Sequence, residues 1–70
     1  MDTEDGVLTG REVEVLLLLV EGHTNREVAS QLYISTRTVE FHRANIQRKL
    51  SAKGRAELMR RAREIGLAGQ

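Results

Sequence analysis

The 70 residues contain no cysteine, which excludes disulfides and thiolate metal sites, and a chain this short has room for one small domain without a deep catalytic cleft. The longest apolar run, residues 15–20, is far shorter than the roughly 20 residues that cross a bilayer, and no secretory signal is present, so we expect a soluble cytoplasmic protein. The net charge of +1 hides a division, because residues 1–34 carry two basic and seven acidic side chains and residues 35–70 carry nine basic and three acidic ones. This asymmetry points to a polyanionic partner for the basic half, although solvated helix faces would carry the same charges.

Four helical signals and no convincing strand predict an all-α fold, a four-helix bundle that contains a helix-turn-helix. The helices are expected at about residues 10–21, 25–32, 36–50 and 55–65. Thr9 with Glu12, and Thr24 with Glu27, have the spacing of a capping box at the start of the first and second helices. Gly22 is suited to end the first helix in a left-handed conformation.

The second, third and fourth expected helices each have an apolar stripe. The members of these stripes are Val28, Ala29 and Leu32 in the second helix, Val39, His42, Ile46 and Leu50 in the third, and Ala56, Met59 and Ala62 in the fourth. Ser35 is placed to cap the third helix and Gly66 to end the fourth.

Only Tyr33, Ile34 and Ser35 separate the second helix from the third. So short a connection prevents long antiparallel contact, so the two helices are expected to cross steeply. This arrangement is a helix-turn-helix, which presents its second helix to the major groove of DNA.

The outward arc of the third helix is predicted to hold Arg37, Phe41, Ala44 and Arg48. Phe41 is the only phenylalanine of the chain, and the major groove offers it the thymine methyl group while arginines take guanine edges or phosphates. Thr38 lies at the amino end of this helix, where amides and a hydroxyl can bind a phosphate oxygen. The alternative is that Phe41 packs on a neighbouring helix and the arginines only solubilise the domain.

Several motifs in this order and spacing resemble the LuxR-type DNA-binding domain, also named after FixJ and NarL. They are residues 8–12, 15–16, 22–29, 34–39 and 42–50. The resemblance covers nearly the whole chain and implies the effector domain of a bacterial response regulator, a sequence-specific transcription factor that binds double-stranded DNA as a dimer. It divides the chain into an acidic lead or linker (1–7), the domain (8–67) and a tail (68–70).

The resemblance also implies roles for single residues. The base-edge positions are Glu40, Phe41 and Ala44, with Arg37 and Arg43 close by. The DNA-backbone positions are Thr24, Asn25, Thr38, Asn45, Arg48 and Lys49. Two residues depart from the family pattern. Many members carry lysine where Glu40 stands, so the base preferred at this position is expected to differ, although the sequence does not identify the base. Gly10 stands where the family frequently has proline.

Partner contacts are expected on the first and fourth helices. The fourth helix of the family supplies the dimer contact, which places Leu58, Arg61 and Ile65 at a weak homodimer interface. Val13, Leu17 and Val20 are interpreted as an exposed apolar strip that docks a regulatory domain or a second copy, or else as part of a fuller core. RNA polymerase is a further expected partner.

The sequence contains no recognisable arrangement of catalytic residues, so it predicts no enzyme activity and no cofactor. His42 is expected in the core, hydrogen-bonded to a backbone group, and His23 is isolated, which gives no metal site. A nucleoid-associated protein with no membrane contact is expected. Two alternatives remain open, a sigma-factor-like promoter-reading domain and a protein-interaction module that uses the apolar strip of the first helix.

Overall fold

The computed structural model describes residues 7–66. The predicted tail (68–70) and nearly all of the acidic lead (1–7) lie outside these residues. The described part consists of four α-helices without a strand, α1 (Gly10–Val20), α2 (Asn25–Leu32), α3 (Thr36–Lys49) and α4 (Arg55–Glu64). The predicted all-α class and the order of the helices are confirmed. None of the described helices is long and apolar enough to span a membrane.

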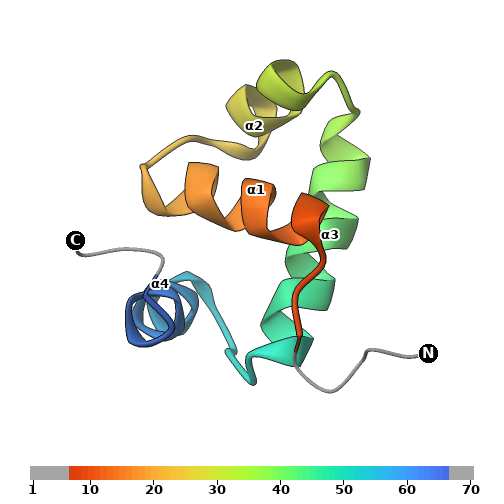
Figure 1. Ribbon diagram of the computed structural model, residues 1–70. Coiled ribbons are helices and arrows are strands. Elements are labelled where there is room, and N and C mark those ends of the chain that lie inside the picture. The colour runs from red at the N-terminus through yellow and green to blue at the C-terminus, as the bar shows by residue number, and fades with distance from the viewer. Residues whose placement is uncertain (1–6, 67–70) are drawn as a thin grey trace.

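Helix α1 lies at the centre of the domain, with α2, α3 and α4 arranged around it (Figure 1). The core that these helices share is fully apolar and contains Val15, Leu16, Leu19, Val28, Ala29, Val39, Ile46, Ala52, Leu58 and Ala62. Each of the four helices contributes at least two of these side chains, so the core holds every helix against the others.

Side chains cap the amino ends of the first three helices as the sequence predicts. The Thr9 hydroxyl accepts from the Glu12 N–H at 3.1 Å, and Glu12 Oε1 accepts from the Thr9 N–H at 2.9 Å. The Thr24 and Glu27 box is formed in the same way, and Ser35 Oγ accepts from an N–H of α3. These bonds satisfy backbone donors that a helix leaves unpaired at its start, which fixes where each helix begins.

The carboxyl ends of the helices share one type of turn, with a residue in the left-handed conformation after the last helical turn. Gly22 and Gly66 occupy this position as predicted, with φ of 102° and 88°. Tyr33 after α2 and Ser51 after α3 adopt the same conformation, with φ of 59° and 55°, although neither is glycine. The turns after α1, α2 and α3 are closed by an N–H that donates to the carbonyl five residues earlier, at 2.8–3.2 Å, as in a Schellman motif.

The left-handed conformation of Tyr33 makes the turn between α2 and α3 short. The chain reverses direction at this residue and Ser35 starts the next helix, so α2 lies across one end of α3 (Figure 1). The predicted helix-turn-helix is thus present.

Helix α4 packs in part with the side predicted. Ala62 is fully buried and Met59 is half-buried against the core, as expected, whereas Ala56 is exposed and Leu58, one turn before Ala62, is fully buried instead. Leucine removes more apolar surface from water than alanine, so the helix turns Leu58 toward the core. The expectation that Leu58 forms a dimer contact is wrong, because this side chain has no exposed surface.

Replacing Tyr33 with glycine should stabilise the domain, because glycine adopts positive φ without the steric cost that a Cβ brings. The side chain is 93% exposed, so its loss removes little packing. We expect a gain of about 0.5–1 kcal/mol in the free energy of unfolding, measured by urea denaturation. Tyr33→Ala is the matched control and should give no gain, because alanine keeps the Cβ. An equal gain from both variants would contradict the explanation.

Candidate nucleic-acid interface

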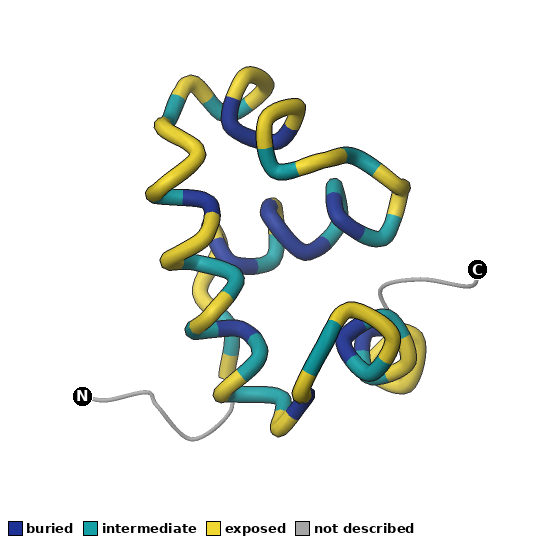
Figure 2. Tube along the Cα trace, turned by 180° about the vertical axis from the view of Figure 1, so that it is seen from behind, coloured by how far each residue is buried: buried dark blue, intermediate teal, exposed yellow. Residues whose placement is uncertain are grey.

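Helix α3 is divided lengthwise into a buried side and an exposed side. Val39 and Ile46 are fully buried against the other helices. On the opposite side every residue is exposed, and Figure 2 shows this alternation along the helix. We call this side the outer face of α3; it consists of Arg37, Glu40, Phe41, Ala44 and Arg48. All five were predicted to point outward or to lie at base-edge and backbone positions.

The Phe41 side chain is largely exposed. It is 63% exposed, and its ring lies beside that of His42, with the ring centroids 6.1 Å apart and the planes tilted by 59°. Phe41 is not among the side chains that pack against the core, which argues against the alternative in which it packs on a neighbouring helix. His42 is half-buried and its ring makes no hydrogen bond with a described residue, so the expected bond from the imidazole to a backbone group is absent.

The other predicted DNA-contacting residues flank this face or begin α2. Thr38 is half-buried, and its hydroxyl lies 2.9 Å from Ser35 Oγ. Asn45 Oδ1 accepts from Arg48 Nη2 at 2.9 Å, which holds the guanidinium close to the helix. Arg43 is half-buried on α3. Thr24 and Asn25 lie at the start of α2, where Thr24 is exposed and Asn25 is half-buried.

Lys49 is not on this surface. Its ammonium lies 2.8 Å from Glu12 Oε1 and also donates to the carbonyl oxygen of Val7 at 3.2 Å. The Lys49 and Glu12 side chains are only 9% and 5% exposed, so the pair is nearly buried. The expected phosphate contact of Lys49 is corrected to an internal ion pair between the end of α3 and the start of α1. Its position three residues after buried Ile46 was a signal for this in the sequence.

The carboxylate of Glu12 is held in its charged form. Burial alone would raise its pKa, but hydrogen bonds from the Lys49 ammonium and the Thr9 N–H, together with the charge of Lys49, outweigh burial and lower the pKa below its ordinary value. One carboxylate therefore caps α1 and neutralises the buried lysine of α3.

The sequence also gave no indication of the role of Arg55. Its Nη2 donates to the carbonyl oxygen of Leu19 at 3.1 Å, at the carboxyl end of α1. This carbonyl also accepts from the Gly22 N–H at 3.0 Å, and a guanidinium in this place matches the negative end of the helix dipole. The two residues are 36 positions apart, so no local pattern could predict the contact.

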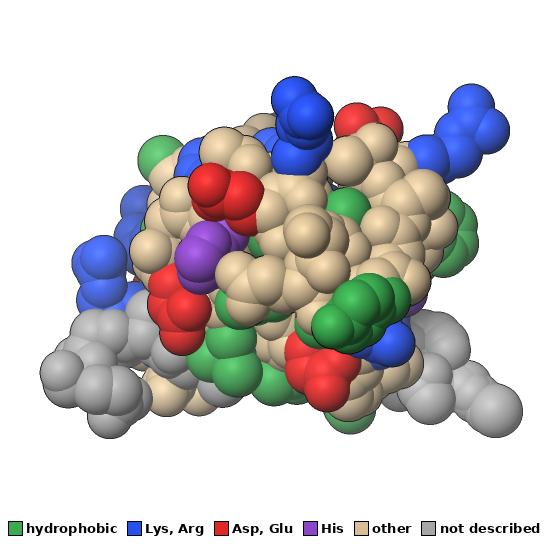
Figure 3. All heavy atoms as spheres, turned by 90° about the horizontal axis from the view of Figure 1, so that it is seen from above, with side chains coloured by type: hydrophobic (Ala, Val, Ile, Leu, Met, Phe, Trp, Pro, Cys, Tyr) green, Lys and Arg blue, Asp and Glu red, His purple; other side chains and the backbone are tan. Residues whose placement is uncertain are grey.

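A polar cluster occupies the turn between α1 and α2. His23 lies 3.5 Å from a Glu21 oxygen and 3.4 Å from a Glu27 oxygen, through its two ring nitrogens. The Thr24 N–H and then His23 lower the pKa of Glu27. Figure 3, which looks onto the α2 end of the molecule, shows acidic side chains beside a histidine. Within residues 7–66 no three potential ligands come together as a metal site.

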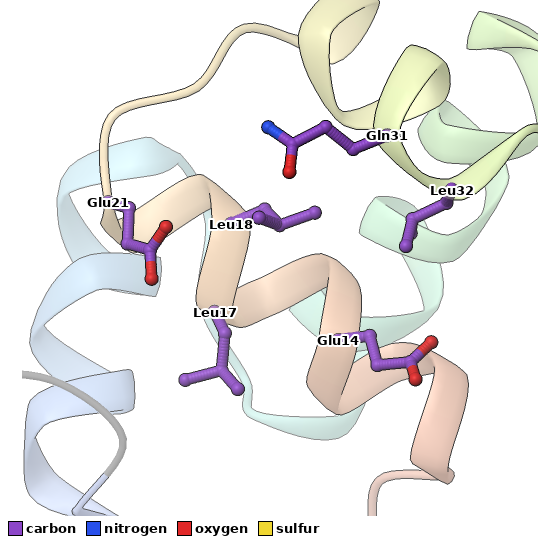
Figure 4. Close-up of a pocket in the computed structure, with 6 residues that line it drawn as sticks. All are labelled: Glu14, Leu17, Leu18, Glu21, Gln31 and Leu32. Carbon is purple, nitrogen blue, oxygen red and sulfur yellow. The ribbon is translucent and has the colours of Figure 1, made fainter.

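A shallow groove of about 300 Å³ lies between α1 and α2 (Figure 4). It is lined by Glu14, Leu17, Leu18, Glu21, Gln31 and Leu32. The predicted exposed strip of Val13, Leu17 and Val20 is wrong as a continuous feature, because all three side chains are half-buried and Val20 packs against the core. Of the three, only Leu17 lines the groove.

The remaining dimer residues lie near the end of α4. Ile65 is 50% exposed, and Arg61 forms an ion pair with Glu64 at 3.0 Å. An exposed isoleucine at a helix end is a small apolar surface, well below the size of a stable dimer interface.

A helix-turn-helix whose second helix keeps an exposed face with arginines and one aromatic ring is typical of DNA-binding domains of the helix-turn-helix class. Residues 6–62 match the family described as bacterial regulatory proteins, luxR family. The chain belongs to this family, whose members are DNA-binding transcription regulators.

The chain is similar to longer regulatory proteins of bacteria. The chain is 43% identical over 65 residues to the uncharacterized response regulatory protein YgeK of Escherichia coli, covering 93% of this chain and 44% of the relative. It is 42% identical over 53 residues to the oxygen regulatory protein NreC of Staphylococcus carnosus, covering 76% of this chain and 24% of that protein. The chain thus spans less than half the length of either relative.

A solved structure shares the fold. The dimeric LuxR-type receptor VqmA of Vibrio cholerae, studied in the absence of its target DNA, superposes with a TM-score of 0.84 at 36% identity. The match covers 87% of this chain and 28% of that one. The four-helix DNA-binding fold expected from the sequence is confirmed.

Replacing Glu12 with glutamine should destabilise the domain in a pH-dependent way. At pH 7 we expect a loss of about 2 kcal/mol in the free energy of unfolding, because a nearly buried lysine loses its charged partner. The pKa of Glu12 is lower in the folded protein than the value of about 4.3 in the unfolded chain, so the charged carboxylate stabilises the fold above that pH. This contribution to the free energy of unfolding is lost as the pH falls through the folded-state pKa. Urea denaturation between pH 7 and pH 3 should therefore show the difference between wild type and variant shrinking toward acid.

The control is Glu14→Gln, which removes the exposed pair with Arg11 and should change stability by less than about 0.5 kcal/mol. A Glu12→Gln difference that stays constant down to pH 3 would show that the carboxylate charge is not the stabilising feature.

Proposed function

We propose that this domain binds double-stranded DNA in a sequence-specific manner, with α3 in the major groove, and thereby regulates transcription. The observation that carries the proposal is the outer face of α3. Its five side chains are exposed, and the core is complete without them. An exposed phenylalanine between two arginines has little use in a fold this small, but it fits a groove that offers thymine methyl groups and phosphates.

Membership of the luxR family favours a transcription regulator over the sigma-factor-like alternative. The interaction-module alternative relied on the apolar strip of α1, of which only Leu17 lines a groove, and it stays a prediction. Since the similar proteins are longer and YgeK is described as a response regulatory protein, we also propose that this domain is the effector part of a response regulator, controlled by a regulatory domain.

The proposed contacts divide into two kinds. Glu40, Phe41 and Ala44, with Arg37 and Arg43, face the base edges, whereas Thr24, Asn25, Thr38, Asn45 and Arg48 contact phosphates. Lys49 is left out of the second kind because its ammonium is bound to Glu12. Its role is to hold the carboxyl end of α3 in place.

The phosphate assignment can be tested by salt dependence. The probe is the duplex that wild type selects from a random pool, and its affinity is measured from 50 to 200 mM salt. Arg48→Gln should reduce the slope of log affinity against log salt by about one unit, because one phosphate contact is lost. Lys49→Gln should leave the slope unchanged while lowering stability.

Arg11→Gln is the control, since Arg11 lies on α1 and pairs with Glu14. A slope that falls equally in the Arg48 and Lys49 variants would overturn the assignment of Lys49 to the fold.

We propose further that two domains pair on DNA through α4, with Ile65 and Arg61 at the contact. The selected duplex should then contain two inverted half-sites. Ile65→Glu should weaken binding to this duplex to about the level of a single half-site, because like charges would meet at the two-fold axis. Binding to a duplex with one half-site should not change. Equal losses on both duplexes would contradict a dimer contact at Ile65.

A further inference from the structure

Glu40 differs from every other glutamate in residues 7–66, because its carboxylate has no hydrogen bond and no ion pair. Each of the other glutamates has a partner: Glu12 binds Lys49, Glu14 binds Arg11, Glu21 and Glu27 bind His23, Glu57 accepts from the Lys53 N–H, and Glu64 binds Arg61. Arginines stand three residues before and after Glu40, within reach along the helix, yet neither pairs with it. The fold therefore makes no use of this charge.

At the position of Glu40, a carboxylate without a hydrogen-bonding partner would weaken DNA binding. It is exposed in the middle of the outer face of α3, the surface that we propose to meet a polyanion. A negative charge there repels phosphates unless its oxygens accept hydrogen bonds from the bases. In the major groove only two bases offer such donors, cytosine through N4 and adenine through N6.

Cytosine fits a carboxylate better than adenine does. Adenine presents the N7 acceptor directly beside its N6 donor, which suits the paired acceptor and donor of a side-chain amide and repels a second acceptor. Cytosine presents its donor without an acceptor of its own on that edge. A carboxylate has acceptors only, so its complement is the N4 amino group of cytosine.

The neighbouring Phe41 adds a second element of recognition. Successive residues of a helix advance by only 1.5 Å, about half the 3.4 Å step between base pairs, so both side chains reach the same short stretch of DNA. The exposed ring has an apolar complement there in the thymine methyl group.

We infer that Glu40 selects a cytosine through its N4 amino group and that Phe41 selects a thymine within two base pairs of it. The inference rests on the proposed binding of α3 in the major groove and specifies the half-site that this surface reads. Arg48 and the other phosphate contacts then supply attraction to DNA of any sequence, and Glu40 weakens binding to sites that lack the cytosine.

Selection from a random duplex pool, with wild type and Glu40→Gln, tests the role of Glu40. Wild type should recover sites with a fixed cytosine, and exchanging this C·G pair should weaken binding on the order of tenfold. Glu40→Gln should change the preferred base at this one position from cytosine to adenine, because an amide pairs with adenine N6 and N7. Glu14→Gln is the matched control on α1 and should select the same sites as wild type.

Deoxyuridine, which lacks the methyl group of thymine, tests the role of Phe41. Replacing the selected thymine with deoxyuridine should weaken wild type several-fold and leave Phe41→Ala unaffected. Circular dichroism checks that each variant is folded, and both side chains are exposed, so folding should persist.

The outcomes separate the inference from the proposed function. If the domain selects a defined site and Glu40→Gln selects the same site, the assignment of cytosine is wrong while DNA binding stands. If wild type and variants select no sequence at all, both the proposed function and this inference fail.

Discussion

The position of α3 depends on the nearly buried ion pair between Glu12 and Lys49. Glu12 Oε1 accepts from Lys49 at 2.8 Å and from the Thr9 N–H at 2.9 Å, so one atom fixes both the start of α1 and the end of α3. Removing two charges from water is costly unless each finds its partner. A displaced α3 would leave both charges unpaired in a partly apolar environment, so the pair restricts α3 to one placement.

This restriction allows α3 to have two separate functions. Val39 and Ile46 join the core, while Ser35 and Ser51 define where the helix begins and where the chain turns away from it. The side chains of the outer face are then free of any structural role. A surface that the fold does not need can change its base preference without loss of stability, and Glu40, whose carboxylate pairs with no described residue, is such a position.

Local chemistry made much of the fold predictable. Capping boxes and Ser35 fixed three helix starts, since these bonds join residues three apart in sequence. Gly22 and Gly66 indicated two of the four stops. The stops at Tyr33 and Ser51 carry no glycine, and there the backbone hydrogen bonds of the turn hold a conformation that the residue itself disfavours. The outer face of α3 followed from helical periodicity alone, because burial of Val39 and Ile46 places the other residues.

The sequence by itself determined the class of fold, the helix-turn-helix and the side of α3 that faces outward, because each depends on residues near one another in the chain. Only the tertiary structure decided which polar groups meet across the domain. Lys49 looked like a phosphate ligand and is an internal partner of Glu12; Leu58 looked like a dimer contact and is core. Helical periodicity places Lys49 near the buried side of its helix, but it cannot name a partner more than thirty positions away, because that choice depends on which helix lies opposite.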